Sequence, residues 1–338
     1  MARDRLLRNP LVHFGDVVLR GVAEVFLQNN PLTGLIFLVG IFISSYIAGL
    51  YALLATVVAT GTAMLLGVPR EQVDKGMYGF NGTLTGLALA YYMAHDAVLP
   101  FYIILAAIFV TIATAFIQDA LSPVNVPILT SSFVLTTWIF LAALYNFGRL
   151  VGGPALGAAH LPANAGLTAA VLTPTDAWMG FLNGVAQVMF QLNIWTGVAI
   201  LIGLLVNSRI SCAAAIVGSL VGLGVAKALG GSASAVREGL YGFNPVLTAV
   251  DLGGIYYLLS GRTVLFTFVA TIVTAVTYGT LATILAPVGL PVLTAAFVIV
   301  TWICLISKKS LTRLQPIPPD AITTAEEHLA AAFRKLGR

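Results

Sequence analysis

Two pairs of polar residues stand inside apolar stretches of this 338-residue chain, where their oxygen atoms could accept hydrogen bonds from a solute. Glu24 in "EVFLQNN" has Gln187 at the matching position of "QVMFQLN", and Thr130 in "PILTSS" has Thr294 in "PVLTAA". A carboxylate at membrane depth is costly, so Glu24 is a functional candidate by default. Each threonine follows prolines that break the chain, and it could cap the helix that begins there. We expect these four side chains to face a solute path.

Each of these residues also has a plain structural interpretation. Glu24 could lie at an aqueous mouth or support the fold, and the two threonines could be only caps or packing residues. A further acid, Asp251, has no acidic partner, because Ala88 occupies its matching position. No charged residue recurs between the matching apolar stretches, so the sequence shows no paired ion site and no proton relay.

Apolar side chains at helical spacing accompany the polar pairs. In "YGFNGTLTGL" Phe80 and Leu84 are four residues apart and share one helix face, as do Phe243 and Leu247 in "YGFNPVLTAV". Two matching aromatic slots would suit a flat solute, although contact with lipid or protein is the usual role of such residues. The asparagine of each "YGFN" segment is expected to join helices by hydrogen bonds.

The residues that follow Glu24 and Gln187 are less similar to one another between the two matching segments. Val25 and Val188 keep register, and we include them in the predicted solute path. Leu27, however, stands where the second copy has Phe190.

The elements that must position these residues come from an internal repeat. "RGVAEVFLQNNPLTGLIFL" (20–38) returns as "NGVAQVMFQLNIWTGVAIL" (183–201), and "YGFNGTLTGL" (78–87) returns as "YGFNPVLTAV" (241–250), at the same offset along the chain. "PILTSSFVLTTWIFL" (127–141) returns as "PVLTAAFVIVTWICL" (291–305) at an offset longer by one position, so one residue is inserted between the second and third blocks. Duplicated apolar bundles are common in transporters, with the path at the interface between the copies.

The amino-acid composition indicates which class of protein this chain belongs to. The chain is 59% hydrophobic and only 9% charged, whereas soluble domains carry about 25% charged residues. We predict an all-α polytopic membrane protein, and we do not interpret the net charge of +4 as a nucleic-acid footprint. No metalloprotease, nucleophile-elbow or P-loop motif is present, so we expect no enzyme and no cofactor or metal.

Six elements are expected in each copy. A half-helix at 15–29 is followed by spans at 33–48, 49–67, 77–94, 98–120 and 130–147. The second copy repeats this with a half-helix at 178–192 and spans at 194–207, 211–229, 240–259, 263–285 and 294–307. The predicted divisions are a segment 1–14, repeats 15–147 and 178–307, a linker 148–177 and a tail 308–338, in which a short helix is expected to start with Thr324 and Glu327 at capping-box spacing.

An odd number of spans per copy requires the two copies to have opposite orientations in the membrane. The distribution of Lys and Arg agrees with both termini on the cytoplasmic side of the membrane. Thirteen of these residues lie in segments expected to be cytoplasmic and three in segments expected to be outside, while Arg20 cannot be assigned to either side. The thirteen are Arg3, Arg5, Arg8, Arg70, Lys75, Arg209, Arg262, Lys308, Lys309, Arg313, Arg334, Lys335 and Arg338, and the three are Arg149, Lys227 and Arg237. Cys212 and Cys304 are expected to be buried thiols.

At these blocks the chain resembles the urea transporter family. The resembling segments are "LRGVAEVFLQNNPLTGL", "YGFNGTLTGLALA" and "PVNVPILTSSFVLTTW" with their partners "YGFNPVLTAVDLGG" and "GLPVLTAAFVIVTW". The resemblance implies a homotrimer in the bacterial inner membrane, with one pore per protomer and passive, channel-like conduction of urea. It implies two slots and a central constriction, built from Glu24, Val25, Phe80, Leu84, Thr130, Gln187, Val188, Phe243, Leu247 and Thr294.

Two other functions stay open. One is a proton- or ion-coupled transporter of a small amide or amine, with Glu24 as the titrating group. The other is a membrane enzyme or a structural scaffold.

Overall fold

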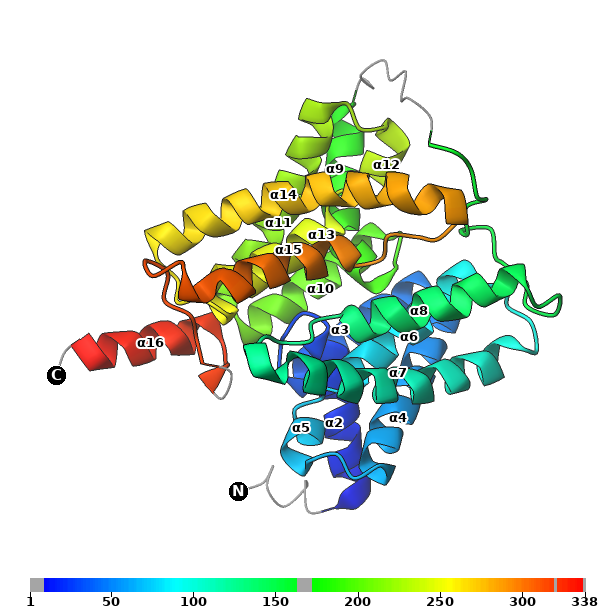
Figure 1. The fold of residues 1–338 in the computed structure, drawn as a ribbon, viewed down its shortest axis with the longest axis horizontal. Helices are drawn as coiled ribbons and strands as arrows, with labels where there is room; N and C mark the ends of the chain where they lie inside the picture. The colour runs from blue at the N-terminus through cyan, green and yellow to red at the C-terminus, as the bar shows by residue number, and fades with distance from the viewer. Residues whose placement is uncertain (1–8, 163–171, 319–320, 337–338) are drawn as a thin grey trace.

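The computed structural model describes residues 9–162, 172–318 and 321–336, and the chain folds there into α-helices joined by short turns. Figure 1 shows the helices of the N-terminal half in one group and those of the C-terminal half in a second group beside it. Extended pairing within the described ranges is limited to two isolated bridges, Met93 with Gly152 and Tyr257 with Pro316. The expected all-α class is therefore confirmed. Arg3, Arg5, Arg8, Arg338 and linker residues 163–171 lie outside the described ranges.

The helix bounds follow the expected segments closely in most places. The first half contains α2 (Pro10–Glu24), α3 (Pro31–Ser44), α4 (Tyr46–Leu65), α5 (Arg70–Asp74), α6 (Gly79–Tyr92), α7 (Leu99–Leu121) and α8 (Ser131–Ala142). The second half contains α9 (Pro174–Ala186), α10 (Ile194–Asn207), α11 (Arg209–Leu229), α12 (Ala233–Arg237), α13 (Phe243–Val250), α14 (Gly261–Leu285) and α15 (Ala295–Ile306), followed by α16 (Ala325–Leu336) in the tail. The short helices α5 and α12 were not predicted.

The first element begins and ends earlier in the chain than predicted. The Asn9 side chain accepts a hydrogen bond from the backbone N–H of Leu11, and Pro10 supplies the first helical residue, so α2 starts before 15. It ends at Glu24 because the chain turns into the left-handed region at Leu27, with φ of 55°. The equivalent residue Phe190 has φ of 57° and ends the second half-helix in the same way.

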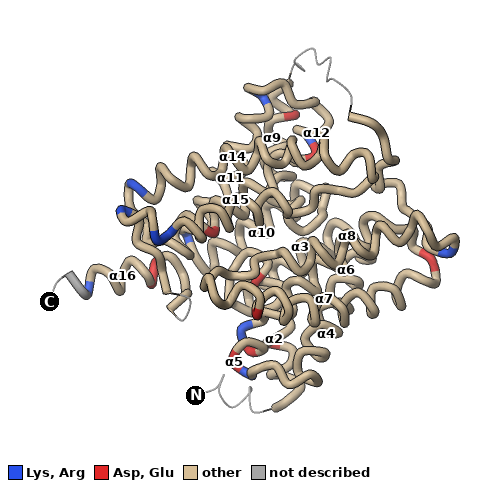
Figure 2. The backbone as a smooth tube through the Cα atoms, viewed as in Figure 1, with Lys and Arg blue, Asp and Glu red and all other residues tan. Residues whose placement is uncertain are grey.

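Four helices are long and apolar enough to cross a membrane alone: Tyr46–Leu65, Leu99–Val124, Arg209–Leu229 and Gly261–Val288. A fifth candidate is the pair Pro174–Met189 and Ile194–Asn207, which is bent by 71° at its break. Figure 2 shows most charged residues at the periphery, near α5, α12 and the helix ends. The protein is thus an integral membrane protein with four or five spans by helix length and composition in the part of the chain that is described, and ten spans remain a prediction.

The two halves make equivalent contacts across their interface. The Thr33 hydroxyl donates to the carbonyl of Gly203 at 2.9 Å, and the Thr196 hydroxyl donates to the carbonyl of Gly40 at 2.7 Å. Thr196 is the repeat counterpart of Thr33, and Gly203 is that of Gly40. This reciprocity means that each half packs against the other through the same surface, as in a two-fold arrangement.

Glycine permits the tight return of each half-helix onto the next helix. A Cβ on Gly34 would overlap the carbonyl oxygen of Leu19, and one on Gly197 would overlap that of Leu182. Both approaches are closer than a van der Waals contact, so only glycine fits. Each half-helix is also held by an equivalent side-chain pair, His13 Nε2 to Asp74 Oδ1 at 3.0 Å in one half and Arg237 Nε to Asp176 Oδ1 at 2.6 Å in the other.

The segment expected as one span at 240–259 is interrupted. Helix α13 ends at Val250, and η4 (Asp251–Ile255) forms a π-helical turn in which Gly254 has φ of 145°. A π-turn holds one residue more than an α-turn. The single insertion that the repeat requires therefore lies in η4, because the hydrogen-bonded counterparts Tyr92 and Tyr256, just after it, already show the longer offset.

Candidate functional site

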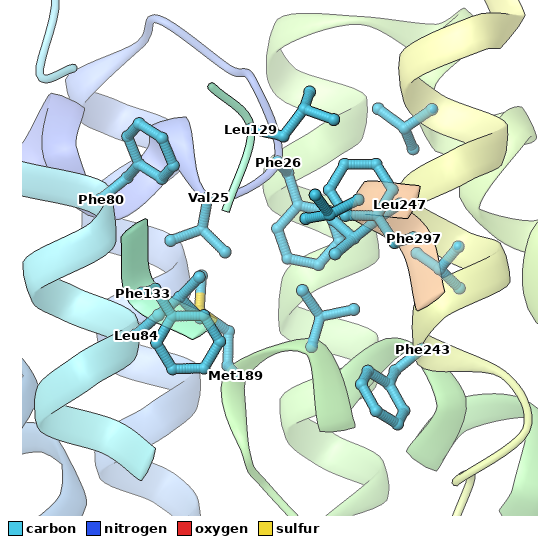
Figure 3. Close-up of a cluster of buried hydrophobic side chains, with 14 of the residues drawn as sticks. Val25, Phe26, Phe80, Leu84, Leu129, Phe133, Met189, Phe243, Leu247 and Phe297 are labelled. Atoms are coloured by element: carbon cyan, nitrogen blue, oxygen red, sulfur yellow. The ribbon is translucent and has the colours of Figure 1, made fainter. Parts of the chain in front are cut away.

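The six predicted apolar residues lie in one buried cluster at the meeting of the two halves. The cluster contains all of Val25, Phe80, Leu84, Val188, Phe243 and Leu247. Figure 3 shows Phe80 and Leu84 at one side and Phe243 and Leu247 at the other, with Phe80 and Phe243 toward opposite ends of the view. Helix α6 positions the first pair and α13 the second, and i, i+4 spacing keeps each pair on one face. The structure therefore brings these six residues together in one cluster.

Buried asparagines hold α6 and α13 against the helices that start at the threonines. Asn81 Oδ1 accepts from the N–H of Phe133 at 3.2 Å, and Asn244 Oδ1 accepts from the N–H of Phe297 at 2.9 Å. These N–H groups belong to the first turns of α8 and α15 and lack partners within their own helices. The predicted helix-joining role of both asparagines is confirmed.

Thr130 and Thr294 meet at the centre of this arrangement. Their hydroxyl oxygens are 2.5 Å apart, and the residues are 3% and 1% exposed. The expectation that these side chains cap helices is wrong: they occupy the N-cap positions of α8 and α15, but neither side chain bonds the helix backbone. They bond one another instead, because the two helix starts face each other across the interface.

The residues before these threonines have an unusual backbone. Leu129 and Leu293 have φ of 53° and 54°, in the left-handed region that leucine rarely adopts. Leu27 and Phe190, which end the half-helices, share this conformation. Such strained residues cost about 1–3 kcal/mol each and cluster at functional sites, where the surrounding fold holds them. Four of them bordering one buried cluster mark it as the candidate site.

Val25, Val188 and the first polar pair lie where the half-helices end. Val188 is in the 3-10 turn η3 (Gln187–Met189), which continues α9, and Val25 directly follows α2. Gln187 is 4% exposed, and its Nε2 atom has no hydrogen-bond partner among the described residues. Oε2 of Glu24 is likewise buried and without a partner in the described part of the chain. Unsatisfied buried polar atoms are costly, so both are suited to contact a solute.

A cavity of about 270 Å³ opens beside Gln187. Its lining includes Gln187 and Phe243 from the predicted set, together with Phe190, Tyr91 and Tyr92. Phe190 contacts both tyrosines, with ring centroids 6.0 Å apart in each case. The cavity therefore joins a polar acceptor to aromatic walls on one side of the threonine pair.

Comparison with known proteins agrees with this geometry. The sequence model of the family described as urea transporter matches residues 15–309. The chain belongs to the urea transporter family. Urea transporter 1 of Ovis aries is 27% identical over 320 residues, covering 94% of this chain and 83% of that protein. Urea transporter 1 of Mus musculus is 26% identical over 321 residues, with the same shares covered.

Membership in the family settles the broad activity. Proteins of this family are transporters or channels and not enzymes, and this urea transporter moves urea across a membrane. The resemblance stated from the sequence is confirmed, and the enzyme alternative is set aside.

Three features of this urea transporter's site were missed from the sequence. Tyr91 and Tyr92 were assigned only to a span, although their adjacent phenols near its predicted end were a signal of a polar mouth. The third is Asp251, which was described as lacking an acidic partner. It is 1% exposed, and neither of its carboxyl oxygens has a hydrogen-bond partner among the described residues.

Proposed function

We propose that this urea transporter is a passive channel whose pore runs between the two halves of the chain. The observation that carries the proposal is the Thr130–Thr294 contact, because it brings two equivalent hydroxyls together at the centre of a buried apolar cluster. Urea would pass the Thr130 and Thr294 hydroxyls on its way from one mouth of the pore to the other, and the two threonines would form the constriction.

The reciprocal contacts between the halves support inverted repeats of five spans and a half-helix each, over 15–147 and 178–307. In Figure 3 the Phe80–Leu84 and Phe243–Leu247 pairs run in opposite directions across the site, as two oppositely oriented copies require. An inverted pair gives the pore two similar mouths. Each mouth then has one half-helix end, one aromatic slot and one polar residue, Glu24 or Gln187.

The chemistry of urea fits such a path. Urea is flat and neutral, and its four N–H groups and carbonyl are strongly hydrated. Removing its water without replacement would cost several kcal/mol. Hydroxyls of Thr130 and Thr294 and the oxygens of Glu24 and Gln187 can replace water, while flat apolar walls set the width of the slots. Urea needs no counter-charge, which fits the neutral threonine pair.

The slots are proposed to differ between the two mouths. Phe190 lines the cavity beside Gln187, whereas the equivalent Leu27 is only partly buried against the same cluster. The wall of the slot is thus aliphatic on the Glu24 side and aromatic on the Gln187 side. We also propose a homotrimer with one pore per protomer, and an inner-membrane orientation with both termini cytoplasmic, supported by the excess of Lys and Arg on that side.

A coupled transporter is the second candidate, favoured by the unpartnered Glu24 oxygen at membrane depth. Urea flux into proteoliposomes, measured with and without an imposed pH gradient and a protonophore, separates the two. A channel gives the same initial rate in all conditions and a rate that rises linearly with urea. A rate that follows the proton gradient and is lost in Glu24→Gln identifies the coupled mechanism instead.

A further inference from the structure

Aromatic rings gather around the cavity beside Gln187. Five rings from both halves of the chain line it: Tyr91, Tyr92, Phe190, Phe243 and Tyr278. Two pairs of these rings meet nearly edge to face. The planes of Tyr92 and Phe190 lie at 81° to each other, and those of Phe243 and Tyr278 lie at 80°. Rings set at such steep angles wall a space on more than one side, as in an aromatic cage.

A carboxylate lines the same cavity. Glu238 directly follows α12 and is partly buried, and it forms no ion pair with any residue in the described ranges. The neighbouring Arg237 is held elsewhere, because its Nε atom donates to Asp176 Oδ1 at 2.6 Å. His160 also lines the cavity, and Nδ1 of its exposed ring is 3.1 Å from the carbonyl oxygen of Leu161. The aromatic cavity therefore includes a carboxylate that is free to pair with a ligand.

The linker between the repeats forms one wall of the cavity. Its residues 155–158 belong to the lining, and the linker is bonded to both halves of the chain. The N–H of Gly153 donates to the carbonyl of Tyr92 at 2.7 Å, and the N–H of His160 donates to the carbonyl of Ala286 at 3.0 Å. These bonds fix the wall, so the cavity is formed before any ligand arrives.

The opposite mouth of the proposed pore lacks most of this set. Three of the five rings have no aromatic counterpart there, since Tyr91, Phe190 and Tyr278 correspond to Ile255, Leu27 and Thr114. The acid is also absent, because Lys75 stands in place of Glu238 and bonds Glu71 at 2.7 Å. Conduction of a neutral solute between two similar mouths does not require this difference. The three additional rings and the acid are specific to the Gln187 mouth, and they point to a ligand of its own.

We propose that this cavity is a binding site for a small methylated ammonium ion, of which tetramethylammonium is the simplest. Such a cation is attracted to the negative faces of aromatic rings and to a carboxylate, and it has no N–H groups that need acceptors. A metal ion would require several oxygen ligands, which aromatic rings do not supply. The cavity of about 270 Å³ has room for an ion several times the volume of a water molecule.

The bound cation would occlude urea at this mouth. Gln187 and Phe243 belong to the proposed urea path and line the same cavity, so cation and urea compete for one space. This consequence rests on the proposed urea channel, whereas binding of the cation does not.

The test uses the purified full-length protein and two independent readouts. The first is binding of tetramethylammonium chloride, measured in detergent by calorimetric titration. Sodium chloride at the same ionic strength and the neutral molecule tert-butanol are the control ligands. The second readout is inhibition of urea flux into proteoliposomes, with tetramethylammonium present on both sides of the membrane.

Four variants separate the ring from the charge. Tyr278→Thr installs the residue of the first half, whereas Tyr278→Phe keeps the ring and removes only the hydroxyl. Glu238→Gln removes the charge and keeps the shape of the side chain. Asp119→Asn removes a charge at an exposed site outside the cavity and is the matched control.

We expect tetramethylammonium to bind the wild type and to inhibit its urea flux. Loss of one ring should weaken binding about 3- to 30-fold in Tyr278→Thr, and loss of the charge should weaken it about threefold or more in Glu238→Gln. Tyr278→Phe and Asp119→Asn should bind within about twofold of the wild type, because the ring face and not the hydroxyl attracts the cation.

Several results would overturn the proposal. One is an absence of binding in the wild type beyond that seen with sodium chloride, and another is an equal response to tert-butanol. Wild-type affinity in both Tyr278→Thr and Glu238→Gln would also contradict it, as would binding that leaves urea flux unchanged. If Tyr278→Thr does not fold, Glu238→Gln gives the same decision. Binding of the cation to a protein that conducts no urea would leave this site standing and refute the channel instead.

Discussion

Replacing Thr130 by valine removes one hydroxyl from the proposed constriction and keeps the shape of the side chain. The Thr294 hydroxyl, 2.5 Å away on a residue 1% exposed, then loses its partner. A buried unsatisfied hydroxyl costs about 1–3 kcal/mol, and urea loses an acceptor at the point where it is least hydrated. If about 1–2 kcal/mol of this lost hydrogen-bond energy is added to the free-energy barrier for urea at the constriction, urea flux falls by about 5- to 30-fold.

The assay is stopped-flow light scattering of proteoliposomes that shrink in an inward urea gradient and recover as urea enters. Thr277→Val is the matched control, because Thr277 is only partly buried and its hydroxyl bonds the carbonyl of Val273 in its own helix. Thr130→Val and Thr294→Val should slow recovery to similar degrees, and the double variant should be slower by less than the product of the two factors, since the two hydroxyls are partners. Flux in Thr130→Val within twofold of that in Thr277→Val would refute the lining role.

Three further predictions concern the fold around the site. Gly34→Ala should strongly destabilise the protein, because its Cβ would clash with the backbone carbonyl of Leu19, whereas the Cβ in Gly61→Ala meets nothing within 4 Å and should not lower the unfolding temperature. Trp138→Phe should cost about 1 kcal/mol of stability, because the indole N–H donates to a carbonyl of the other half at 2.8 Å; an unchanged unfolding temperature would count against that bond. Partial burial alone would raise the pKa of Glu326, but hydrogen bonds from the Ile210 N–H and the Ser208 hydroxyl outweigh it and lower that pKa below its usual 4.5. A lowered pKa means that the contact stabilises docking of α16 above about pH 4.5 and is lost as the pH falls further. Limited proteolysis should therefore cut the tail of the wild type more slowly than that of Glu326→Gln at neutral pH, and the difference between the two should disappear as the pH falls below about 4.

The repeat made much of the site predictable. Matching blocks at a nearly constant offset identified equivalent positions, and helical spacing then selected Phe80 with Leu84 and Phe243 with Leu247 for one face each. The change of offset also predicted one inserted residue, which the structure places in the π-turn at Asp251. These inferences needed only local periodicity and the comparison of two copies.

Other features depended on contacts that no local pattern encodes. The side chains of Thr130 and Thr294 had the residue type and position of helix caps, but their role is decided by two helix starts that meet across the interface. The buried acid Asp251 has Ala88 at its equivalent position, so it breaks the symmetry that guided the prediction. The early end of α2 came from the backbone turn at Leu27, a residue type that gives no turn signal.

The central claim is that urea passes through the protein passively. We would measure urea-driven volume recovery of proteoliposomes containing the purified protein, with identical salt and pH on both sides. A passive pathway predicts recovery much faster than in empty vesicles, at a rate that a protonophore leaves unchanged. Recovery no faster than in empty vesicles, with the protein shown to be folded and inserted, would contradict it.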